Sequence, residues 1–420
     1  MTAEKIPTVI ARSPSRHPYF FRKMLASGLK AAQPGDLVRV VLEESQQTLG
    51  YGLYNPRAEM AVRTLTRGDV IPDEAWWKAQ LGAAVRFRKE TLGLDQQGDA
   101  YRLIHAEGDG LPGLMVDLYG DVLSVEAFSL GMYQRAESIL DILVSLTKAK
   151  HGILRPGPYA AHLEGFDADP FGSENAPESV VITENGVKYE VRFEEGHKTG
   201  FFCDQRNNRA RIAEMAAGQR VLDLCCYTGG FALAAAVGGA TQVQGVDLDE
   251  DAIAVAKKNA KLNGVEIQWA HADIFAWMRE AQKTGQQWDL VILDPPKLIR
   301  TREDYEEGRK KYFDMNRLAA SLVAPGGMLV TCSCSGLLSP ADFTRVSGYA
   351  IDNAGRSARL CEQTGAGPDH PVHVRCPESL YLKVNWFWFD EAPASPAASR
   401  SARVEVEDYS EQLKAMGIED

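Results

Sequence analysis

A cysteine follows directly on an apolar stretch in the order Leu329-Val330-Thr331-Cys332-Ser333-Cys334. A deprotonated, accessible cysteine can act as a covalent nucleophile. Carbon 5 of a pyrimidine is a poor nucleophile, but a thiolate that adds to carbon 6 makes carbon 5 reactive towards an electrophilic methyl group. We therefore interpret Cys334 as a candidate nucleophile for methylation of a pyrimidine base. Cys332 falls within the apolar stretch, so we expect it to be buried.

A glycine-containing turn after a second apolar stretch could bind the methyl donor. It begins at Asp223, contains Tyr227 and reaches Gly229-Gly230. It has neither the G-x-G-x-x-G spacing of a dinucleotide site nor a P-loop lysine, whereas paired glycines let a ligand approach the backbone closely. With Asp247 after the next expected strand, the turn suits a ligand that has an ammonium group and ribose hydroxyls but no phosphate. We predict that S-adenosylmethionine binds here.

The candidate residues share one position relative to the expected strands. Five of them stand at or just past the ends of successive strands: Asp223, Asp247, Asp273, Asp294 and Cys334. Ligands of open α/β sheets bind outside the carboxyl ends of the strands, so the five positions predict one shared site. One acidic residue alone would be weaker evidence, because it is often a helix cap.

The sequence Asp294-Pro295-Pro296-Lys297 predicts a rigid turn at this edge. Each proline fixes its own φ and restricts the residue before it. Asp294 and the carbonyl after it would therefore be held beside the methyl donor, where they could bind the edge of a base. Variants of this turn also occur in enzymes that methylate exocyclic amines, so the turn does not identify the target atom.

These residues require an α/β sheet to position them. Strands alternate with helices from about residue 205 onwards, which predicts a parallel sheet. Short strands separated by turn residues predict a small barrel near the N-terminus. We therefore predict an α/β fold with four parts: a small β-barrel at residues 8–72, a central α+β domain at 73–185, a Rossmann-like sheet at 186–390 and a disordered acidic tail at 391–420.

The composition is that of a globular protein, with 25% charged residues and a net charge of −11 over 420 residues. No apolar run is long enough to span a membrane, and the first residues lack the layout of a signal peptide, so we expect a cytoplasmic protein. The 7 cysteines show no disulfide spacing and no second Cys/His pair, so we expect free thiols and no metal site. An excess of Lys and Arg in the first 70 residues suits contact with phosphates.

The order of motifs along the chain resembles that of the RlmI-type 23S rRNA cytosine-5 methyltransferases, over roughly residues 10–389. Arg16-His17-Pro18 resembles part of the N-terminal PUA domain of that family, and Tyr101–Ile104 with Asp109–Gly113 resembles its middle domain. The other matching motifs are His197–Arg206, Tyr227–Phe231, Leu293–Lys297, Ser333–Gly336, Asp369–Val372 and Pro377–Lys383.

The resemblance implies S-adenosylmethionine as cofactor, RNA as substrate and Cys334 as nucleophile. It also implies that the small barrel is PUA-like and that the Rossmann-like sheet is a class I methyltransferase sheet. The implied cofactor contacts are Asp223, Tyr227, Gly229, Asp247, Asp273 and Asp294, with Gln205 and Phe202 closing over the cofactor. The implied substrate contacts are Lys198, Pro295, Pro296 and Lys297. Related enzymes that have the same Lys-Thr-Gly segment but lack this cysteine methylate guanine, so Cys334 is the discriminating residue. The chain departs from the family at Asp223, where Asn is more common.

The base that removes the carbon-5 proton is left open. Glu378 resembles in placement the glutamate of uracil-5 methyltransferases, and His370 and His373 compete with it. Further alternatives are a guanine N-methyltransferase, a uracil-5 methyltransferase, and a non-catalytic RNA-binding protein with a degenerate methylase domain. The sequence leaves a homodimer open and does not name the modified nucleotide.

Overall fold

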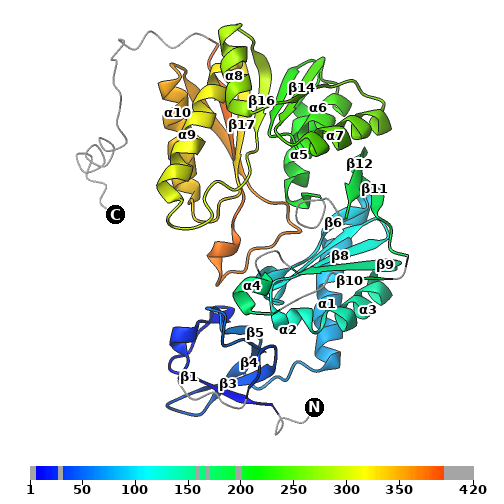
Figure 1. The fold of residues 1–420 in the computed structure, drawn as a ribbon, viewed down its shortest axis with the longest axis vertical. Coiled ribbons are helices and arrows are strands. Elements are labelled where there is room, and N and C mark those ends of the chain that lie inside the picture. Colours follow the sequence, from blue (N-terminus) through cyan, green and yellow to red (C-terminus); the bar gives the residue numbers. More distant parts are fainter. Residues whose placement is uncertain are drawn as a thin grey trace, which may run out of the picture.

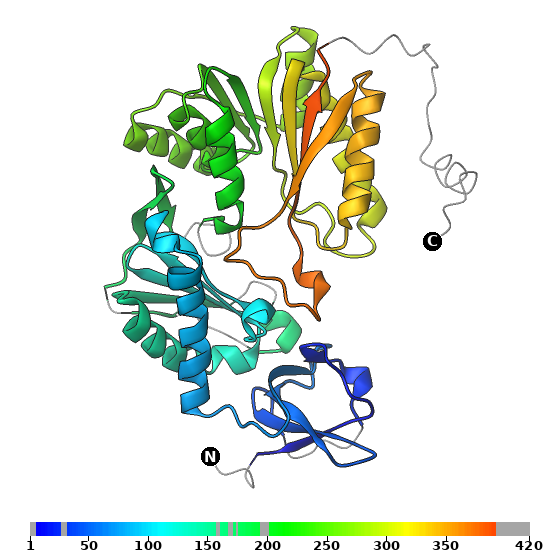
Figure 2. The same ribbon diagram turned by 180° about the vertical axis from the view of Figure 1, so that it is seen from behind.

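Three parts of the molecule follow one another along its long axis (Figures 1 and 2). The computed structural model describes residues 6–26, 32–156, 160–166, 171–173, 175–193 and 201–391. The N-terminal barrel lies at one end, a central sheet lies in the middle and a larger sheet lies at the other end. Apart from Glu391, the predicted acidic tail falls outside the described residues. None of the helices in the described part of the chain is long and apolar enough to cross a bilayer.

The N-terminal part is a 5-stranded sheet that encloses a small apolar core. Its strand order is β1-β3-β4-β5-β2; β1 pairs with β3 in parallel, and the other pairs are antiparallel. The core includes Val9, Phe20, Val38, Val40 and Val62. The elements are β1 (Thr8–Ala11), β2 (Tyr19–Phe20), η2 (Arg22–Met24), β3 (Leu37–Leu42), β4 (Thr48–Tyr54) and β5 (Val62–Arg67).

A helix, α1 (Glu74–Arg86), links the barrel to the central sheet. The side chain of Asp73 caps it by accepting a hydrogen bond from the Trp76 amide, and the helix runs into a π-helical turn, η3 (Phe87–Thr91). The central sheet has the order β10-β9-β8-β7-β6. Its elements are η4 (Leu94–Gln96), β6 (Ala100–His105), η5 (Ala106–Asp109), β7 (Leu114–Tyr119), β8 (Val122–Ala127), α2 (Leu130–Tyr133), α3 (Ala136–Thr147), β9 (His151–Pro156), α4 (Ala160–Glu164) and β10 (Phe171–Gly172).

A hairpin of β11 (Ser179–Glu184) and β12 (Val187–Arg192) leads into the large sheet. Asn185 and Gly186 in its turn both have positive φ (48° and 82°), which suits the type I′ turn that an Asn-Gly pair favours. The Glu190 amide donates a hydrogen bond to Asn259 on a helix of the large sheet. Our predicted domain boundary between residues 185 and 186 runs through this turn.

The large sheet has 7 strands in the order β15-β14-β13-β16-β17-β19-β18. Strand β19 runs antiparallel to its neighbours β17 and β18, and the strands from β15 to β17 are parallel. The strand order reverses between β13 and β16, which opens a crevice at the carboxyl ends of these strands. The strands are β13 (Arg220–Leu224), β14 (Gln242–Asp247), β15 (Gln268–His271), β16 (Trp288–Leu293), β17 (Val323–Ser333), β18 (Ala358–Thr364) and β19 (Lys383–Phe389).

Helices cover both faces of the large sheet (Figures 1 and 2). They are η6 (Cys203–Gln205), α5 (Arg206–Met215), α6 (Gly230–Val237), α7 (Glu250–Asn263), α8 (Ile274–Lys283), α9 (Tyr305–Ser321), α10 (Pro340–Asn353) and the short η7 (Pro377–Ser379). The sheet buries one apolar cluster on each of its faces. Because successive residues of a strand point to opposite faces, Leu222 of β13 belongs to one cluster and Val221 to the other. The predicted fold class, a methyltransferase sheet with a small barrel and a central α+β part, is confirmed.

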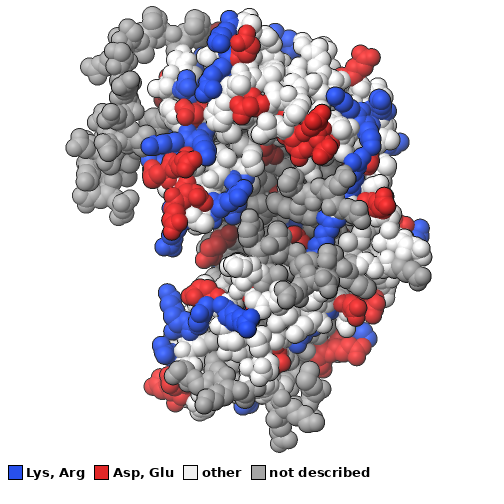
Figure 3. Space-filling view, in the orientation of Figure 1, with Lys and Arg blue, Asp and Glu red and all other residues white. Residues whose placement is uncertain are grey.

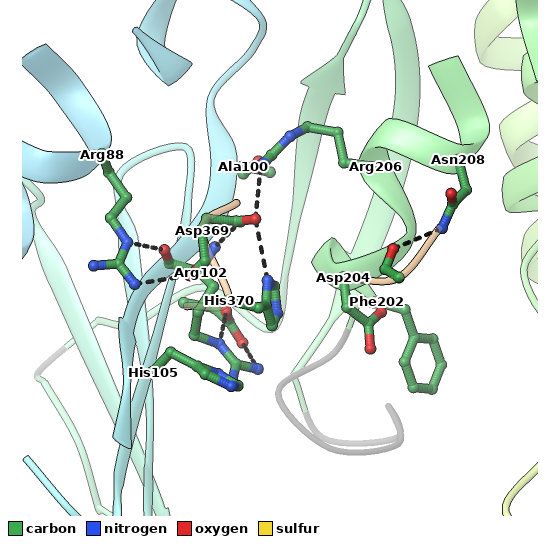
Figure 4. A network of polar contacts seen from close by, with 12 residues as sticks. Arg88, Ala100, Arg102, His105, Phe202, Asp204, Arg206, Asn208, Asp369 and His370 are labelled. Atoms are coloured by element: carbon green, nitrogen blue, oxygen red, sulfur yellow. Dashed lines mark hydrogen bonds and ion pairs between the residues drawn. The ribbon is translucent and has the colours of Figure 1, made fainter. Parts of the chain in front are cut away.

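A buried network of charges joins the central sheet to the large sheet (Figure 4). Asp369, between β18 and β19, pairs with Arg206 of α5 at 2.8 Å and accepts the Arg102 amide of β6 at 2.9 Å. The Arg88 guanidinium donates to the Asp369 carbonyl at 2.7 Å and also pairs with Asp109. Because Arg88, Arg206 and Asp369 are buried, solvent screens these pairs little. They fix the segment between β18 and β19 to the central part.

The surroundings of Asp369 keep it ionised. Burial acts to raise the pKa of Asp369, but His370, Arg206 and the Arg102 amide outweigh burial and hold this pKa well below its usual range. Burial and the charge of Arg102 hold the pKa of His105 well below its usual value, so His105 is neutral beside the arginine. Removing one cation from the network would therefore leave a buried carboxylate that is only partly compensated.

We expect Arg206→Met to lower the free energy of unfolding by about 3–5 kcal/mol, because it leaves Asp369 charged and buried without this partner. Urea denaturation followed by circular dichroism measures this loss. Arg211→Met is the matched control, because Arg211 lies on the same helix, is 49% exposed and pairs with Glu214 at the surface. It should cost less than about 1 kcal/mol. Equal losses in the two variants would contradict the role of the buried pair.

Candidate active site

The turn after β13 holds three residues in the left-handed backbone region. Cys225, Tyr227 and Gly229 have φ values of 61°, 49° and 87°. They recur at every second position, which is the spacing of glycines in a G-x-G-x-G turn, but only Gly229 is a glycine. A Cβ on Gly229 would lie 2.7 Å from the Trp269 ring, so this position has no room for a side chain. Glycine at position 229 therefore lets the turn pack against Trp269 at the start of α6.

Asp223 lies beneath this turn and is fully buried. Its Oδ2 accepts a hydrogen bond from the Ala232 amide at 2.9 Å, whereas its Oδ1 is buried without a hydrogen-bond partner. Burial raises the pKa of Asp223 to about 8, the charges of Asp294 and Asp247 add to this shift, and the Ala232 amide opposes it. An orphaned carboxylate oxygen of this kind is costly unless a ligand pairs with it. Asp223 could thus receive a cationic group.

Asp247 holds the turn in place from the end of β14. Its Oδ2 accepts the Tyr227 amide at 2.7 Å, and its Oδ1 accepts the Asp249 amide at 2.9 Å. Asp273 is exposed and caps α8 by accepting the Ala276 amide at 3.0 Å. Both carboxylates lie at or just past strand ends, as expected. Asp247 also stabilises the turn, and Asp273 also stabilises the start of α8.

Phe202 and Gln205 approach the turn from the segment before α5. The rings of Phe202 and Tyr227 meet edge-on, with centroids 5.4 Å apart. The buried Gln205 side chain donates to Asp294 Oδ2 at 3.1 Å and accepts from Asn208 at 2.6 Å. The structure therefore brings together the residues expected to close over a cofactor. Lys198 lies outside the described residues.

The turn Asp294-Pro295-Pro296-Lys297 follows β16 at the same edge. Asp294 is half-buried and Pro295 is buried, whereas Pro296 and Lys297 are exposed. The Asp294 amide donates to the carbonyl of Leu224 in the neighbouring strand β13 at 3.2 Å, which continues the sheet into the turn. The exposed half of the turn is the part that a substrate could reach.

Cys334 stands between two buried serines that fix its backbone. The Tyr312 hydroxyl of α9 lies 3.0 Å from both Ser333 Oγ and Ser335 Oγ. Ser335 Oγ also accepts the Ile299 amide, at 3.1 Å, from the loop after Pro295-Pro296. Cys334 itself is half-buried. The two serines thus bind the segment Ser333–Ser335, called here the cysteine loop, both to α9 and to the loop that follows Pro295 and Pro296.

Cys332 is fully buried, which confirms the expectation from its place in the strand. Burial raises the pKa of the Cys332 thiol well above its usual value, and Asp294 adds to the shift. Burial and nearby carboxylates likewise raise the pKa of Cys225 and Cys226. These three cysteines therefore stay as thiols at neutral pH.

Glu378 lies in η7, which reaches the barrel (Figure 1). Its carboxylate is 69% exposed and lies 3.7 Å from His17 Nε2 of the barrel. The structure therefore places Glu378 against His17 and not at the carboxyl edge of the sheet. His370 belongs to the buried network around Asp369.

His17, Cys376 and Glu378 are close enough to suggest a metal site, but the tautomer of His17 argues against one. Their potential ligand atoms lie within 4.8 Å of one another. His17 Nδ1, however, accepts a hydrogen bond from the Tyr19 amide at 3.1 Å. The neutral ring must then carry its proton on Nε2, the atom that faces the cluster, and a protonated nitrogen cannot bind a metal.

Sequence reasoning did not find the contributions of Lys383, Tyr312 and Trp269. The Nζ of Lys383, the first residue of β19, donates a hydrogen bond to the carbonyl of Ser335 next to Cys334. A charged residue at the start of a largely apolar strand was the signal that could have found it. Tyr312 and Trp269 give no signal in the sequence, because their contacts with the cysteine loop and with Gly229 are long-range.

Comparison with known proteins agrees with this geometry. A model of the S-adenosylmethionine-dependent methyltransferase family matches residues 158–369, and a PUA-like domain model matches residues 10–67. Ribosomal RNA large subunit methyltransferase I of Pseudoalteromonas atlantica is 35% identical over 376 residues, which cover 88% of this chain and 94% of the relative. The chain belongs to this methyltransferase family. The resemblance seen in its motifs is thus confirmed.

A second relative supports the same assignment, and two solved structures show the same fold. The ribosomal RNA large subunit methyltransferase of Deinococcus radiodurans is 34% identical over 386 residues and is covered to 94%, with 89% of this chain. A SAM-dependent methyltransferase structure from Streptococcus mutans has a TM-score of 0.76 at 20% identity, covering 91% of this chain and all of the other. A methyltransferase complexed with SAH has a TM-score of 0.75 at 22% identity, covering 91% and 99%. These two likenesses show a common fold.

The residues at the sheet edge fit S-adenosylmethionine, the cofactor of this family, on two observations. The orphaned Asp223 Oδ1 can accept a hydrogen bond from an ammonium group. The half-buried turn residues Cys225, Tyr227 and Thr228 lie above Asp223, where a ligand could reach them. Asp247 and Asp273, at the next two strand ends, could bind hydroxyl and amino groups of the nucleoside.

We expect the affinity for S-adenosylhomocysteine, which keeps the ammonium group, to rise as the pH is raised towards about 8. The ammonium group pairs with the ionised carboxylate of Asp223, and below its pKa this form becomes roughly tenfold rarer per pH unit. Isothermal titration calorimetry over this range measures the effect. Asp223→Asn should bind more weakly and lose this dependence, and an identical pH profile in the variant would rule out the pairing.

We expect Tyr312→Phe to destabilise the fold by about 1–3 kcal/mol, because the buried hydroxyls of Ser333 and Ser335 lose the Tyr312 hydroxyl and each keeps only a backbone amide as partner. The same change should lower kcat for methylation, since Ser333 and Ser335 no longer fix Cys334, while the affinity for S-adenosylhomocysteine is retained. Thermal unfolding and single-turnover kinetics measure the two effects. Unchanged kcat would show that the hydroxyl does not position the nucleophile.

Proposed function

We propose that this enzyme uses S-adenosylmethionine to methylate carbon 5 of a cytosine in large-subunit ribosomal RNA. The observation that carries the proposal is the placement of Cys334 at the carboxyl end of β17, half-buried and fixed between Ser333 and Ser335. The names of the relatives supply the class of RNA. Because the proposed substrate is ribosomal RNA, we place the reaction in the cytoplasm.

In the proposed reaction, the Cys334 thiolate adds to carbon 6 of the cytosine ring. This addition raises the electron density at carbon 5, which then accepts the methyl group. Bound S-adenosylmethionine supplies that group from a sulfonium centre. Loss of the carbon-5 proton then expels the thiolate and restores the ring. Asp294, Pro295, Pro296 and Lys297 are proposed to hold the base, because the exposed half of their turn adjoins the cysteine loop through Ile299 and Ser335.

We propose that the PUA-like barrel (residues 8–72) and the central domain (residues 73–185) bind the RNA. Residues 186–390 would carry out methyl transfer. Figure 3 shows a hollow between the barrel and the methyltransferase part, with Lys and Arg side chains on both sides of it and acidic side chains among them. Phosphate groups favour such basic rims. A base must leave its stack to reach Cys334, so a loop or loosened helix is the proposed target.

The second candidate is N-methylation of guanine, which needs no covalent nucleophile. It is favoured by the Asp294-Pro295-Pro296 turn, because enzymes that methylate amines use similar turns. Uracil-5 methylation would use the same thiolate as cytosine-5 methylation, and the two differ in the product. The identity of the methylated nucleotide therefore separates all three reactions.

We expect Cys334→Ala to abolish methylation of the target nucleotide, whereas Cys332→Ala should retain it. Cys332 is the matched control, since it lies two positions away in the same segment and is buried. Mass-spectrometric mapping of ribosomal RNA from cells that lack this gene, rescued with each variant, measures the result. A 5-methylcytosine that disappears in the deletion and returns only with Cys332→Ala and the wild type supports the proposal. Full activity of Cys334→Ala would instead favour the guanine reaction.

A further inference from the structure

Lys383 is a buried lysine at the head of β19, and no carboxylate among the described residues forms a salt bridge with it. It is 5% exposed. Its Nζ donates to the carbonyl oxygens of Ser335, at 2.5 Å, and of Tyr381, at 2.9 Å. Burying an ammonium group without a carboxylate is costly. A lysine held in this way therefore needs an explanation.

The position of Lys383 relative to Cys334 provides one. Lys383 is the cross-strand partner of Ser333 in the antiparallel pair of β17 and β19. Its Nζ reaches along β17 to the carbonyl of Ser335. Cys334 lies between these two serines in the chain, so the ammonium group is bound to the backbone directly after the residue that carries the thiol. An ammonium group has three donors, and the two carbonyls take two of them.

We propose that Lys383, as a buried ammonium group, stabilises the thiolate of Cys334 for attack on the base. The S–H bond of Cys334 breaks, the sulfur keeps the electron pair and the proton passes to water. The carbonyl oxygens of Ser335 and Tyr381 hold the ammonium group in place. When the thiolate is later expelled from carbon 6, it leaves with its electron pair and the lysine remains its counter-ion. This role deepens the proposed function and rests on it.

The charges around the pair support this role for Lys383. Burial lowers the pKa of Lys383 to about 8, Cys334 acts to raise it and Lys297 acts to lower it further. With a pKa of about 8, Lys383 is mostly an ammonium ion at neutral pH and can act as the counter-ion of a thiolate. The other ionisable groups that interact with this pair or lie next to it are Asp294 after β16, Tyr312 on α9 and Cys332 in β17. Lys383 and Lys297 are the cations among them.

The thiols at the same edge show what happens to a cysteine without such a neighbour. Burial and the carboxylates of Asp223, Asp247 and Asp294 raise the pKa of Cys225 well above its usual value. The cofactor site is therefore a negative environment that opposes thiolate formation. A cation at Cys334 offsets this field where the nucleophile is needed.

The test measures alkylation of Cys334 by iodoacetamide as a function of pH, with mass spectrometry to follow each cysteine separately. In the full-length wild-type protein, we expect the rate at Cys334 to reach half its maximum below about pH 8.5, the ordinary pKa of a thiol. Lys383→Met keeps the length of the side chain but removes the amine, and it should raise this midpoint by about one pH unit or more. The rate at neutral pH would then fall roughly tenfold.

Two internal controls accompany this measurement. Cys361 is exposed on β18 and should react equally in all variants. Lys311→Met removes an exposed lysine of α9 that pairs with Glu307, and it should leave the Cys334 profile unchanged. Binding of S-adenosylhomocysteine by Lys383→Met shows whether the variant is folded.

The outcomes separate this inference from the proposed function. A wild-type midpoint at or above about pH 8.5 would overturn the inference without use of any variant. So would an unchanged midpoint in a folded Lys383→Met. If either result accompanied an inactive Cys334→Ala, the proposed reaction would stand and the role of Lys383 would fall. Full methylation by Cys334→Ala would overturn the proposed function itself, and the inference with it.

Discussion

The buried ion pair between Arg206 and Asp369 is the interaction on which the arrangement of the three parts depends. Asp369 lies in the long connection between the last two strands of the large sheet, and its carboxylate and carbonyl are bound by groups from two parts of the molecule. The connection leaves the sheet, crosses the central part, touches the barrel at Glu378 and returns as β19. The direction of β19 follows from this route. Since β19 starts where β17 ends, its first residue lies beside the cysteine loop.

Opposite electrostatic demands meet at the carboxyl edge of the sheet. Three carboxylates, Asp223, Asp247 and Asp294, create a negative region suited to a cationic methyl donor. The same region disfavours a thiolate. The structure places the two kinds of group on different strands. The carboxylates lie at the carboxyl ends of β13, β14 and β16, whereas the cysteine follows β17, next to the antiparallel strand β19, which begins with a lysine. A parallel neighbour in that position would have ended at this edge and could not have begun there.

The sequence predicts the site where its signals are local. Asp223, Asp247, Asp273, Asp294 and Cys334 could be placed at strand ends because each follows its own apolar stretch, and the strand order of the sheet agrees with that placement. The left-handed φ of Cys225 and Tyr227 could not be foreseen, because the residue types argue against it. Lys383, Tyr312 and the Arg88–Asp369 contact depend on residues that are far apart in the chain. Glu378 lies in a motif that matches the family, but the motif does not indicate which way its side chain points, and in the structure it faces His17.

The left-handed conformation of Cys225 and Tyr227 in the cofactor turn has a consequence for how this protein could be engineered. A non-glycine residue in that region costs roughly 1–2 kcal/mol relative to an unstrained one, and glycine is free of this cost. Cys225 and Tyr227 therefore each lower the stability of the fold by the cost of their backbone conformation. Glycine at position 225 would remove part of this cost and would also remove an oxidisable thiol. Glycine at position 227 would remove a similar cost, but it would also remove the ring that contacts Phe202. A more heat-resistant form of this enzyme is therefore better sought at position 225 than at position 227.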